Sequence, residues 1–350
     1  MRQRAMLGGA FAVSIVAGVL HYAGVDAVVV FIVSGLALAA LAWVVGFATE
    51  AVGARFGPAT TGVLQSTLGN LPELFIVLFA LAAGEVVVAR TAVLGSLFAN
   101  ALLVLGLAIV AGSWRARDGV MRFHRRLPND TATLLLLAVF IIVLVGIAHE
   151  VDDPASEHEI AISAICAVLL LSVYAVWLWG YLRPPTGAEP ALHEETRPAI
   201  PFRSAVALLA AAGVGAALVS DWFVAALDPA VDALGISKAF TGLVIVAIAG
   251  NAVENVVGIT LAAKGQNDLA ISVVKNSVAQ IAVFLYPALV LLSLFFEHRL
   301  TFVIGPVAIG ALVLMAISVW QITGDGEAVA FEGWALVALY LMLAVIAWFE

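Results

Sequence analysis

The sequence predicts an all-α integral membrane protein with about eleven transmembrane helices, arranged as one N-terminal helix plus two inverted five-helix repeats. Composition predicts the membrane: 63% of the residues are hydrophobic and 11% are charged, whereas a soluble domain carries roughly 25% charged residues. The apolar segments predict the helix count. A short polar phrase that occurs twice predicts the repeat.

Each predicted helix is an apolar run of about 20 residues, the length that crosses roughly 30 Å of hydrocarbon. Residues 1–4 (MRQR) are a positive start like that of a signal peptide, but no small-residue cleavage site follows, so the first run is interpreted as a helix. Cys166 is the single cysteine, which excludes an intrachain disulfide or a cysteine metal cluster and predicts a packing role. The runs are 5–22, 27–48, 60–83, 86–112, 131–149, 160–182, 202–222, 239–263, 268–295, 301–321 and 328–349.

The distribution of Lys and Arg predicts which loops face the cytoplasm. With a cytoplasmic N-terminus and eleven crossings, the inner loop at 114–126 contains five arginines, whereas the outer side receives only Arg90, Lys238 and Arg299. The outer loops at 149–159 and 221–232 are acidic instead. We therefore expect a multi-pass protein of the plasma (cell inner) membrane with its N-terminus in the cytoplasm.

A stretch rich in proline and glutamate marks the boundary between the repeats. Glu189, Glu194 and Glu195 in it could form a regulatory cation site, but carboxylates in a solvated loop are ordinary, and we interpret the stretch as a cytoplasmic linker. The predicted divisions are an N-terminal transmembrane helix (1–24), a first five-helix repeat (25–183), the linker (184–201) and a second five-helix repeat (202–350).

The phrase GNLPE at 69–73 returns as GNAVE at 250–254, each time within an apolar segment. Ser96 and Ser277 are separated by the same 181 positions as the two phrases. The first repeat begins with a helix that runs inward and the second with a helix that runs outward. The repeats are therefore inverted, which is the architecture of many secondary transporters.

The repeated phrase supplies the ligands that a hard cation prefers. A carboxylate inside a bilayer is costly, so the Glu of each copy is predicted to be functional. The Asn three positions earlier shares its helix face, the Gly weakens the helix, and the proline of the first copy frees the carbonyl four positions before it. Doubled by the repeat, these oxygens suit Ca²⁺, which takes about 6–8 of them. The predicted site comprises Glu73, Glu254, Asn70, Asn251, Gly69, Gly250 and the carbonyl of Leu68.

Polar residues outside the phrases extend the predicted site. Glu50 and Asp221, which follow Thr49 and Ser220 near helix ends, are expected in cation-attracting vestibules. Lys275 lies near the expected depth of the site, where it would pair with Glu254 or Asp268 or extend to the inner interface. Amide and hydroxyl groups on the helix after each phrase are expected as secondary ligands or as ordinary packing contacts; they are Ser96, Asn100, Ser277 and Gln280.

The same pair of carboxylates suits coupling to protons. Two buried carboxylates close together resist being ionised together once the cation leaves, so they would take up protons as a pair. Cation and proton then compete for one site, and alternating access yields exchange. The alternative, that each Glu only fixes helix packing, is less favoured because the whole phrase is repeated.

These segments resemble the calcium/cation antiporter superfamily, nearest to the proton-coupled calcium exchangers, over residues 47–106 and 220–287. The family's first repeat reads approximately GNATEL followed by LLGSILSNLLLVLG, and this chain has GNLPEL followed by VLGSLFANALLVLG. The second reads approximately GNAAEH, a KDKMDLA-like turn and GSSIQIAL, and this chain has GNAVEN, KGQNDLA and NSVAQIAV. The resemblance implies an eleven-helix inverted-repeat fold in which Glu73 and Glu254 bind the cation and the protons.

The chain departs from the family pattern at three places. Asn255 replaces the second-repeat histidine, Lys275-Asn276 replaces a segment led by glycine, and the Leu-Pro-Glu of the first phrase is similar to the sodium/calcium exchanger branch. Exchange of Ca²⁺, or a similar divalent cation, for protons is the main prediction. A sodium-coupled cation exchanger is the alternative.

Two other classes of protein fit the sequence less well. A passive cation channel usually arranges acidic residues in rings around a symmetric pore, whereas a pseudo-symmetric pair in one chain favours a carrier. Zinc proteolysis requires paired histidines such as HExxH, and the 6 histidines of this chain do not make that pattern. We expect no enzymatic activity and no resident cofactor. The expected partners are the transported cation, the proton and the lipid bilayer, without nucleic acid.

Overall fold

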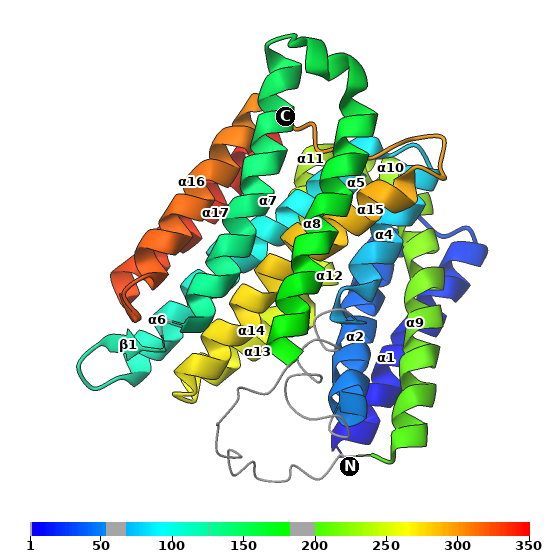
Figure 1. Cartoon of the computed structure of the whole chain (residues 1–350). Helices are drawn as coiled ribbons and strands as arrows, with labels where there is room; N and C mark the ends of the chain where they lie inside the picture. The colour runs from blue at the N-terminus through cyan, green and yellow to red at the C-terminus, as the bar shows by residue number, and fades with distance from the viewer. Residues whose placement is uncertain (1, 54–67, 125, 183–199) are drawn as a thin grey trace.

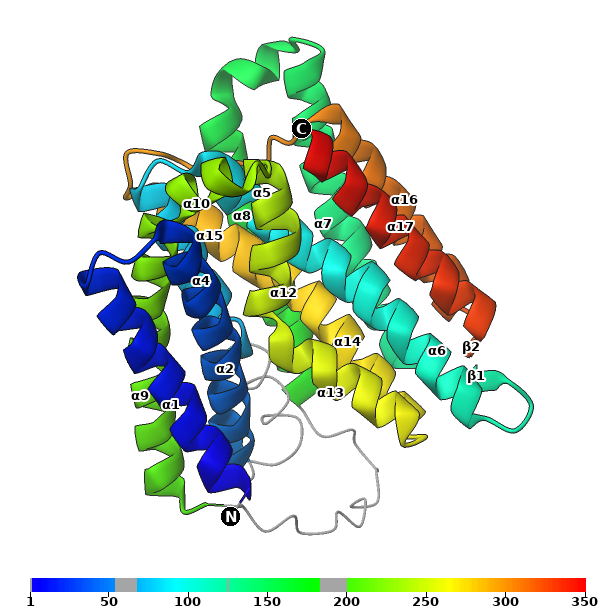
Figure 2. The same cartoon turned by 180° about the vertical axis from the view of Figure 1, so that it is seen from behind.

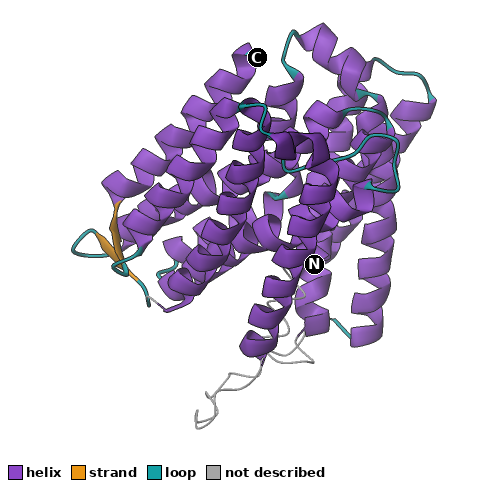
Figure 3. Cartoon of the chain, turned by 45° about the horizontal axis from the view of Figure 1, so that its top comes forward, coloured by secondary structure: helices purple, strands orange, loops and turns teal. Residues whose placement is uncertain are grey.

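Helices make up almost the whole of the computed structural model, which describes residues 2–53, 68–124, 126–182 and 200–350 (Figures 1 and 3). An apolar chain in a bilayer must satisfy its backbone hydrogen bonds within each segment, and a helix does this for every residue of its interior. The first half forms α1 (Arg2–Tyr22), α2 (Ala27–Gly53), α4 (Leu71–Ala82), α5 (Val86–Phe98), the π-helical turn η1 (Ala99–Val104), α6 (Leu105–Arg115), strand β1 (Val120–Arg122), α7 (Arg126–Glu150), the short 3-10 helix η2 (Pro154–His158) and α8 (Glu159–Leu182).

The second half begins with the long helix α9 and continues through several broken helices. It forms α9 (Phe202–Ala225), α10 (Leu227–Leu234), α11 (Lys238–Phe240), the π-helical turn η3 (Thr241–Val246), α12 (Ala247–Gly250), α13 (Ala252–Ala263), α14 (Asn267–Gln280), the π-helical turn η4 (Ile281–Leu285), α15 (Tyr286–Ser293), α16 (Pro306–Thr323), strand β2 (Glu327–Val329) and α17 (Ala330–Phe349).

The lengths of the helices confirm the all-α membrane class. Among the described residues, nine helices are long and apolar enough to cross a membrane, or ten if Leu227–Leu234 and Lys238–Gly250, bent by 118°, form one span. The predicted count of eleven is not confirmed. Only α4 represents the predicted segment 60–83, because residues 54–67 lie outside the described part, and the predicted segment 239–263 is divided at Asn251.

Three groups of helices form the bundle. On one side α2 and α9 pack along each other and α1 packs against both, while α6, α7, α16 and α17 form the opposite side (Figure 2). The helices that carry the two phrases (α4, α12 and α13) and the helices that follow them (α5 and α14) lie between these sides (Figures 1 and 2). The polar phrases are therefore at the centre of an apolar bundle.

The two repeats share structural details beyond the phrase itself. Gly84 and Gly265 have φ values of 85° and 80°, and each turns the chain from the helix that begins at a phrase into the next helix. Such positive φ values favour glycine, which has no Cβ. Each following helix contains a π-helical turn, η1 in the first half and η4 in the second. Turns of this kind occur frequently at functional sites.

A two-stranded ribbon at the edge of the bundle was not predicted. β1 and β2 pair antiparallel, with Val120 opposite Val329, and join the α6–α7 loop to the turn before α17. Arg122 Nη1 lies 2.5 Å from Asp118 Oδ2 in this loop. Its hydrogen bond holds the pKa of the Asp118 carboxyl below the usual value.

Candidate cation site

Both phrases lie at a break in a helix, and the Asn is the residue at the break. Asn70 precedes α4 with φ −83° and ψ 5°, and Asn251 separates α12 from α13 with φ −105° and ψ 20°. The next helix starts in the same way in each half, with Leu74 N bonded to Asn70 O at 3.0 Å and Asn255 N bonded to Asn251 O at 3.1 Å. The Asn thus ends one helical segment and starts the next.

Helix breaks place each Glu in the first turn of a helix. Glu73 is in the first turn of α4 and is 0% exposed, and Glu254 has the equivalent place in α13, although its side chain is outside the described part of the chain. A helix N-terminus favours a carboxylate. Pro72 lies at the start of α4, where its missing N–H disturbs no helical bond. The predicted role of the Leu68 carbonyl stays a prediction.

Residues of the second phrase contact Glu73 of the first. A Cβ on Gly250 would lie 3.4 Å from Glu73 Cβ, so the backbone of one phrase packs against the side chain of the other. Asn251 Nδ2 lies 3.5 Å from Glu73 Oε2, the outer limit of a hydrogen bond, and donates to Ser96 Oγ at 2.7 Å. The structure therefore brings Glu73, Ser96, Gly250 and Asn251 together from both repeats.

Uncharged oxygen atoms of the second phrase and of the helices that follow the two phrases are buried and free to bind a ligand. The Asn100 amide nitrogen donates to the Ser96 carbonyl at 3.0 Å, which orients the side chain. Asn251 Oδ1, Asn100 Oδ1, Ser277 Oγ and Gln280 Oε1 have no hydrogen-bond partner among the described residues, and none of these residues is more than 2% exposed. Buried polar atoms are normally satisfied, so these oxygens suit a ligand such as a hard cation.

The remaining predicted residues lie around this centre. Asn70 is 3% exposed and Gly69 is buried, whereas Glu50 and Asp221 are exposed near the ends of α2 and α9, as expected of vestibule groups. Their effect on cations stays a prediction.

Lys275 is buried on α14, and one of its contacts is to a residue that the sequence did not indicate. Its Nζ donates to Thr323 Oγ1, at the end of α16, over 2.7 Å, while Thr323 donates to the Val319 carbonyl at 2.7 Å. Asp268 accepts from the backbone nitrogen of His124 at 2.6 Å and lies 3.1 Å from its ring. Of the alternatives for Lys275, the pair with Asp268 is wrong, because Asp268 faces the ribbon loop. The pair with Glu254 stays a prediction, since the Glu254 side chain lies outside the described part of the chain.

Sequence reasoning missed the glycines that let the two halves approach each other. A Cβ on Gly95 would lie 2.5 Å from Leu243 Cα, and one on Gly242 would lie 2.8 Å from the Val88 carbonyl. Hence α5 and η3 pack backbone to backbone beside Ser96. Gly95 immediately precedes a predicted site residue, which is the one signal that could have indicated it.

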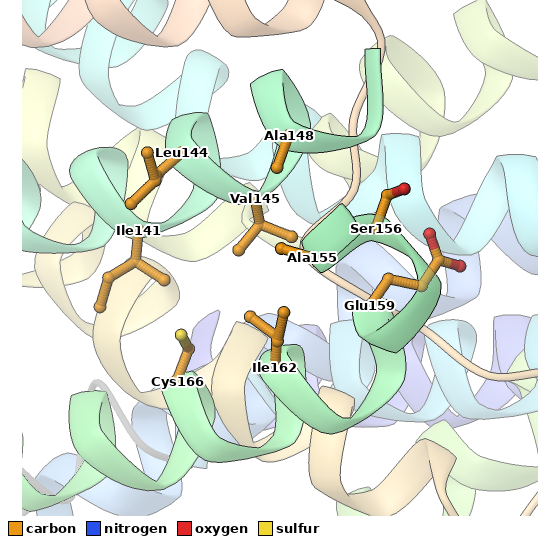
Figure 4. A pocket seen from close by; sticks show the side chains of 9 residues that line it. All are labelled: Ile141, Leu144, Val145, Ala148, Ala155, Ser156, Glu159, Ile162 and Cys166. Atoms are coloured by element: carbon orange, nitrogen blue, oxygen red, sulfur yellow. The ribbon is translucent and has the colours of Figure 1, made fainter. Parts of the chain in front are cut away.

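A separate cavity lies away from the phrases, between α7 and the η2–α8 segment (Figure 4). It has a volume of about 240 Å³, and its lining includes the apolar side chains of Ile141, Val145 and Ile162, as well as Cys166. The carboxylate of Glu159 at its edge is 3.1 Å from His149 Nδ1. None of the predicted site residues lines this cavity. Cys166 packs here, as the sequence predicts.

Broken helices that place paired polar phrases at the centre of an apolar bundle define a multi-pass membrane transporter. The chain belongs to the sodium/calcium exchanger protein family, whose pattern matches residues 26–182 and 204–349.

Proteins of known function and solved structure agree with this family. The chain is 33% identical over 91% of its length to the vacuolar calcium ion transporter of Schizosaccharomyces pombe, covering 79% of that protein. It is 30% identical over 95% of its length to the Ca²⁺/H⁺ antiporter ChaA of Bacillus subtilis, covering 94% of it. Native YfkE superposes with a TM-score of 0.82 at 27% identity, over 97% of this chain and 98% of that one.

A more distant solved structure supports the fold alone. The H⁺/Ca²⁺ exchanger CAX superposes with a TM-score of 0.73 at 15% identity, over 100% of this chain and 93% of that one.

Proposed function

We propose that this protein exchanges Ca²⁺ for protons across a membrane by alternating access, with Glu73 and Glu254 as the carboxylates that bind both. The observation that carries the proposal is the contact between repeats, in which Asn251 and Gly250 of the second phrase meet Glu73 of the first. Relatives named as Ca²⁺/H⁺ antiporters support protons rather than Na⁺ as the coupling ion.

The Asn251 amide combines a hydrogen-bond donor with an oxygen that can bind a cation. Its nitrogen donates to Ser96 Oγ and to the Ala247 carbonyl, at 2.7 and 3.0 Å. This leaves the amide oxygen, a hard ligand, to accept a cation. With Asn70, Asn100, Ser277 and Gln280, neutral oxygens complete a ligand set in which only the carboxylates carry charge.

Coupling follows from that division of charge. Two carboxylates balance the two positive charges of Ca²⁺, and the neutral oxygens replace its hydration shell. When the cation leaves, the apolar surroundings disfavour two neighbouring negative charges, so the carboxylates take up protons. The site is therefore neutral both with Ca²⁺ bound and with both carboxylates protonated. In either of these two forms the protein changes between its inward-facing and outward-facing states.

The sidedness of the protein rests on its loops. We place the N-terminus and the arginine-rich loop before α7 in the cytoplasm, following the positive-inside rule, and assign the chain to the plasma (cell inner) membrane. The named relatives are transporters, and we expect no enzymatic activity. Residues 184–199 of the predicted linker at 184–201 lie outside the described part of the chain.

Flux measurements in reconstituted vesicles test the proposal. With an imposed pH gradient, wild-type protein is expected to take up Ca²⁺, and Glu73→Gln and Glu254→Gln are each expected to abolish uptake because the amide can neither balance the cation charge nor carry the proton. Glu150→Gln, at an exposed position at the end of α7, is the matched control and should transport normally.

Two results would contradict the proposal. Uptake that survives Glu73→Gln or Glu254→Gln would remove the carboxylate from the site. Uptake that follows a Na⁺ gradient and ignores pH would replace proton coupling by sodium coupling.

A further inference from the structure

Hydroxyl groups within the helices differ in how they are satisfied. Several donate to the carbonyl one turn earlier in their own helix, as Ser14 does to Ala10 at 2.9 Å and Ser172 to Val168 at 2.7 Å. Outside the candidate cation site, Ser34 and Thr49 on α2 and Ser220 on α9 behave differently. Each is 0% exposed, and in the described part of the chain none of their hydroxyl oxygens has a hydrogen-bond partner.

Such groups are costly in an apolar bundle. A buried hydroxyl without a partner loses its bonds to water without replacing them, although a helix offers each of these side chains the carbonyl one turn earlier as an acceptor. The three hydroxyls are nevertheless buried, on helices that pack along each other. Three such exceptions on one helix pair indicate polar contents in the interfaces of these helices.

Two of the hydroxyls each precede an acidic residue near the end of their helix, one in each half of the chain. Thr49 is followed by Glu50 and Ser220 by Asp221, and in both cases the hydroxyl is buried and the carboxylate is exposed. α2 and α9 run antiparallel, so these pairs lie near opposite ends of the bundle (Figure 2). Each end of the molecule thus has an exposed acid next to a buried, unsatisfied hydroxyl.

The helix of each hydroxyl packs against the phrase helix of the other repeat. α2, which carries Thr49, contacts α12 and α13, and α9, which carries Ser220, contacts α4. The hydroxyls are therefore on the elements that connect each surface with the helix of a motif carboxylate, Glu254 for α2 and Glu73 for α9.

The third hydroxyl reinforces the side of Asp221. The rings of Phe31 and Phe223 stack with centroids 4.5 Å apart. Ser34 follows Phe31 by three positions and Ser220 precedes Phe223 by three, so on antiparallel helices both hydroxyls lie about 4.5 Å further into the bundle, at one level. Two unsatisfied hydroxyls thus lie at the same level on α2 and α9, about one turn inside this aromatic pair.

We propose that these hydroxyls line the two half-pathways by which Ca²⁺ and protons reach the motif carboxylates: Ser220 with Ser34 on the Asp221 side, and Thr49 on the Glu50 side. This inference rests on the proposed function and extends its site to both surfaces. A hydroxyl accepts from one water molecule while donating to another, and its oxygen is a ligand for a hard cation. Each hydroxyl thereby replaces part of the hydration shell of the cation as the cation moves from the surface acid to the central site.

Sided cysteine labelling tests the half-pathways directly. Because Cys166 is the single native cysteine, a Cys166→Ala background gives one reactive thiol in each of Thr49→Cys, Ser220→Cys and the control Ser14→Cys. A membrane-impermeant methanethiosulfonate reagent is applied to vesicles of both orientations. We expect Thr49→Cys to react only from the Glu50 side and Ser220→Cys only from the Asp221 side, several-fold more slowly with Ca²⁺ present, and Ser14→Cys from neither side.

Labelling separates this inference from the function on which it rests. If Thr49→Cys and Ser220→Cys react from neither side, or from the same side, in protein that still exchanges Ca²⁺ for protons, the half-pathways are wrong. If wild-type protein shows no exchange while the sided labelling is found, the pathways stand and the proposed ions are wrong.

Transport kinetics give a second readout. Thr49→Val and Ser220→Ala keep the packing volume but remove the hydroxyl. We expect each variant to lower the maximal rate of Ca²⁺ uptake several-fold at equal amounts of protein. Thr49→Ser, which keeps a hydroxyl, should retain the wild-type rate. Ser172→Ala, whose hydroxyl bonds to its own helix, should leave the rate unchanged. Wild-type rates in both Thr49→Val and Ser220→Ala would overturn the proposal.

Discussion

Asn251 joins the two repeats by hydrogen bonds within the candidate cation site. Its amide nitrogen is shared between Ser96 of the first repeat and Ala247 of its own helix, and it approaches the Glu73 carboxylate. The residue types and their spacing predicted that Asn and Glu act together. They did not predict that the Asn of one phrase contacts the Glu of the other, because contacts across 178 positions depend on the packing of helices.

Lys275 gives a prediction at the scale of one residue. Its buried ammonium donates to Thr323 Oγ1, and Thr323→Val removes that acceptor. We expect a loss of about 1–3 kcal/mol in the free energy of unfolding, since a bond to a charged donor is lost inside the bundle. Thermal unfolding in detergent measures the change, and Thr323→Ser, which keeps the hydroxyl, is the control.

The double variant isolates the contact. Lys275→Met with Thr323→Val should be less destabilised than the sum of the two single variants, because both partners are then apolar. Additive losses would show that the bond does not contribute.

Breaks and close approaches of helices give the site its shape at the scale of elements. α12 ends at Gly250 and α13 begins at Ala252, so the helix is interrupted within the second phrase. The contact of α5 with η3 requires glycine at two positions, Gly95 and Gly242. The sequence contains 30 glycines, and only the packing distinguishes these two.

Adding a methyl group at this contact tests its importance. Gly95→Ala and Gly242→Ala are each expected to lower the free energy of unfolding by about 1–3 kcal/mol through overpacking, and to reduce transport because Ser96 is displaced. A Cβ on Gly213 would meet nothing within 4 Å, so Gly213→Ala should be neutral or stabilising, as expected in a helix. Unchanged thermal unfolding of Gly95→Ala would contradict the close packing.

An ion-pair cluster ties the halves together at the scale of the whole molecule. Lys238 Nζ lies 2.7 Å from Glu85 Oε2, in the turn between α4 and α5, and 2.7 Å from Asp228 Oδ1 on α10. It therefore joins the end of the first phrase helix to the bend that precedes the second. Opposite charges so far apart in the chain give no sequence pattern.

Removing the cation of this cluster should weaken the link modestly. Lys238→Met leaves two carboxylates facing each other, and we expect about 1 kcal/mol or less of lost stability, because Lys238 and Asp228 are partly exposed to solvent. The difference from wild type should shrink at high salt, which screens such charges. Lys264→Met is the control, because Lys264 is exposed and lies at the C-terminal end of α13. A loss that does not depend on salt would assign the effect to packing instead.

Apolar length and repeated polar residues are local properties that a bilayer constrains strongly, so they were enough to predict the membrane class, the repeated phrase and the residue types of the candidate site. The sequence also predicted the positions of most helices, including α2, α7, α9 and α14. It did not predict the β1–β2 ribbon or the partner of Lys275. Neither these two features nor the approach of Gly250 to Glu73 and the unsatisfied hydroxyls on α2 and α9 can be predicted without the packing of the helices. Each depends on which helix faces meet, and hydrophobicity does not distinguish one apolar face from another.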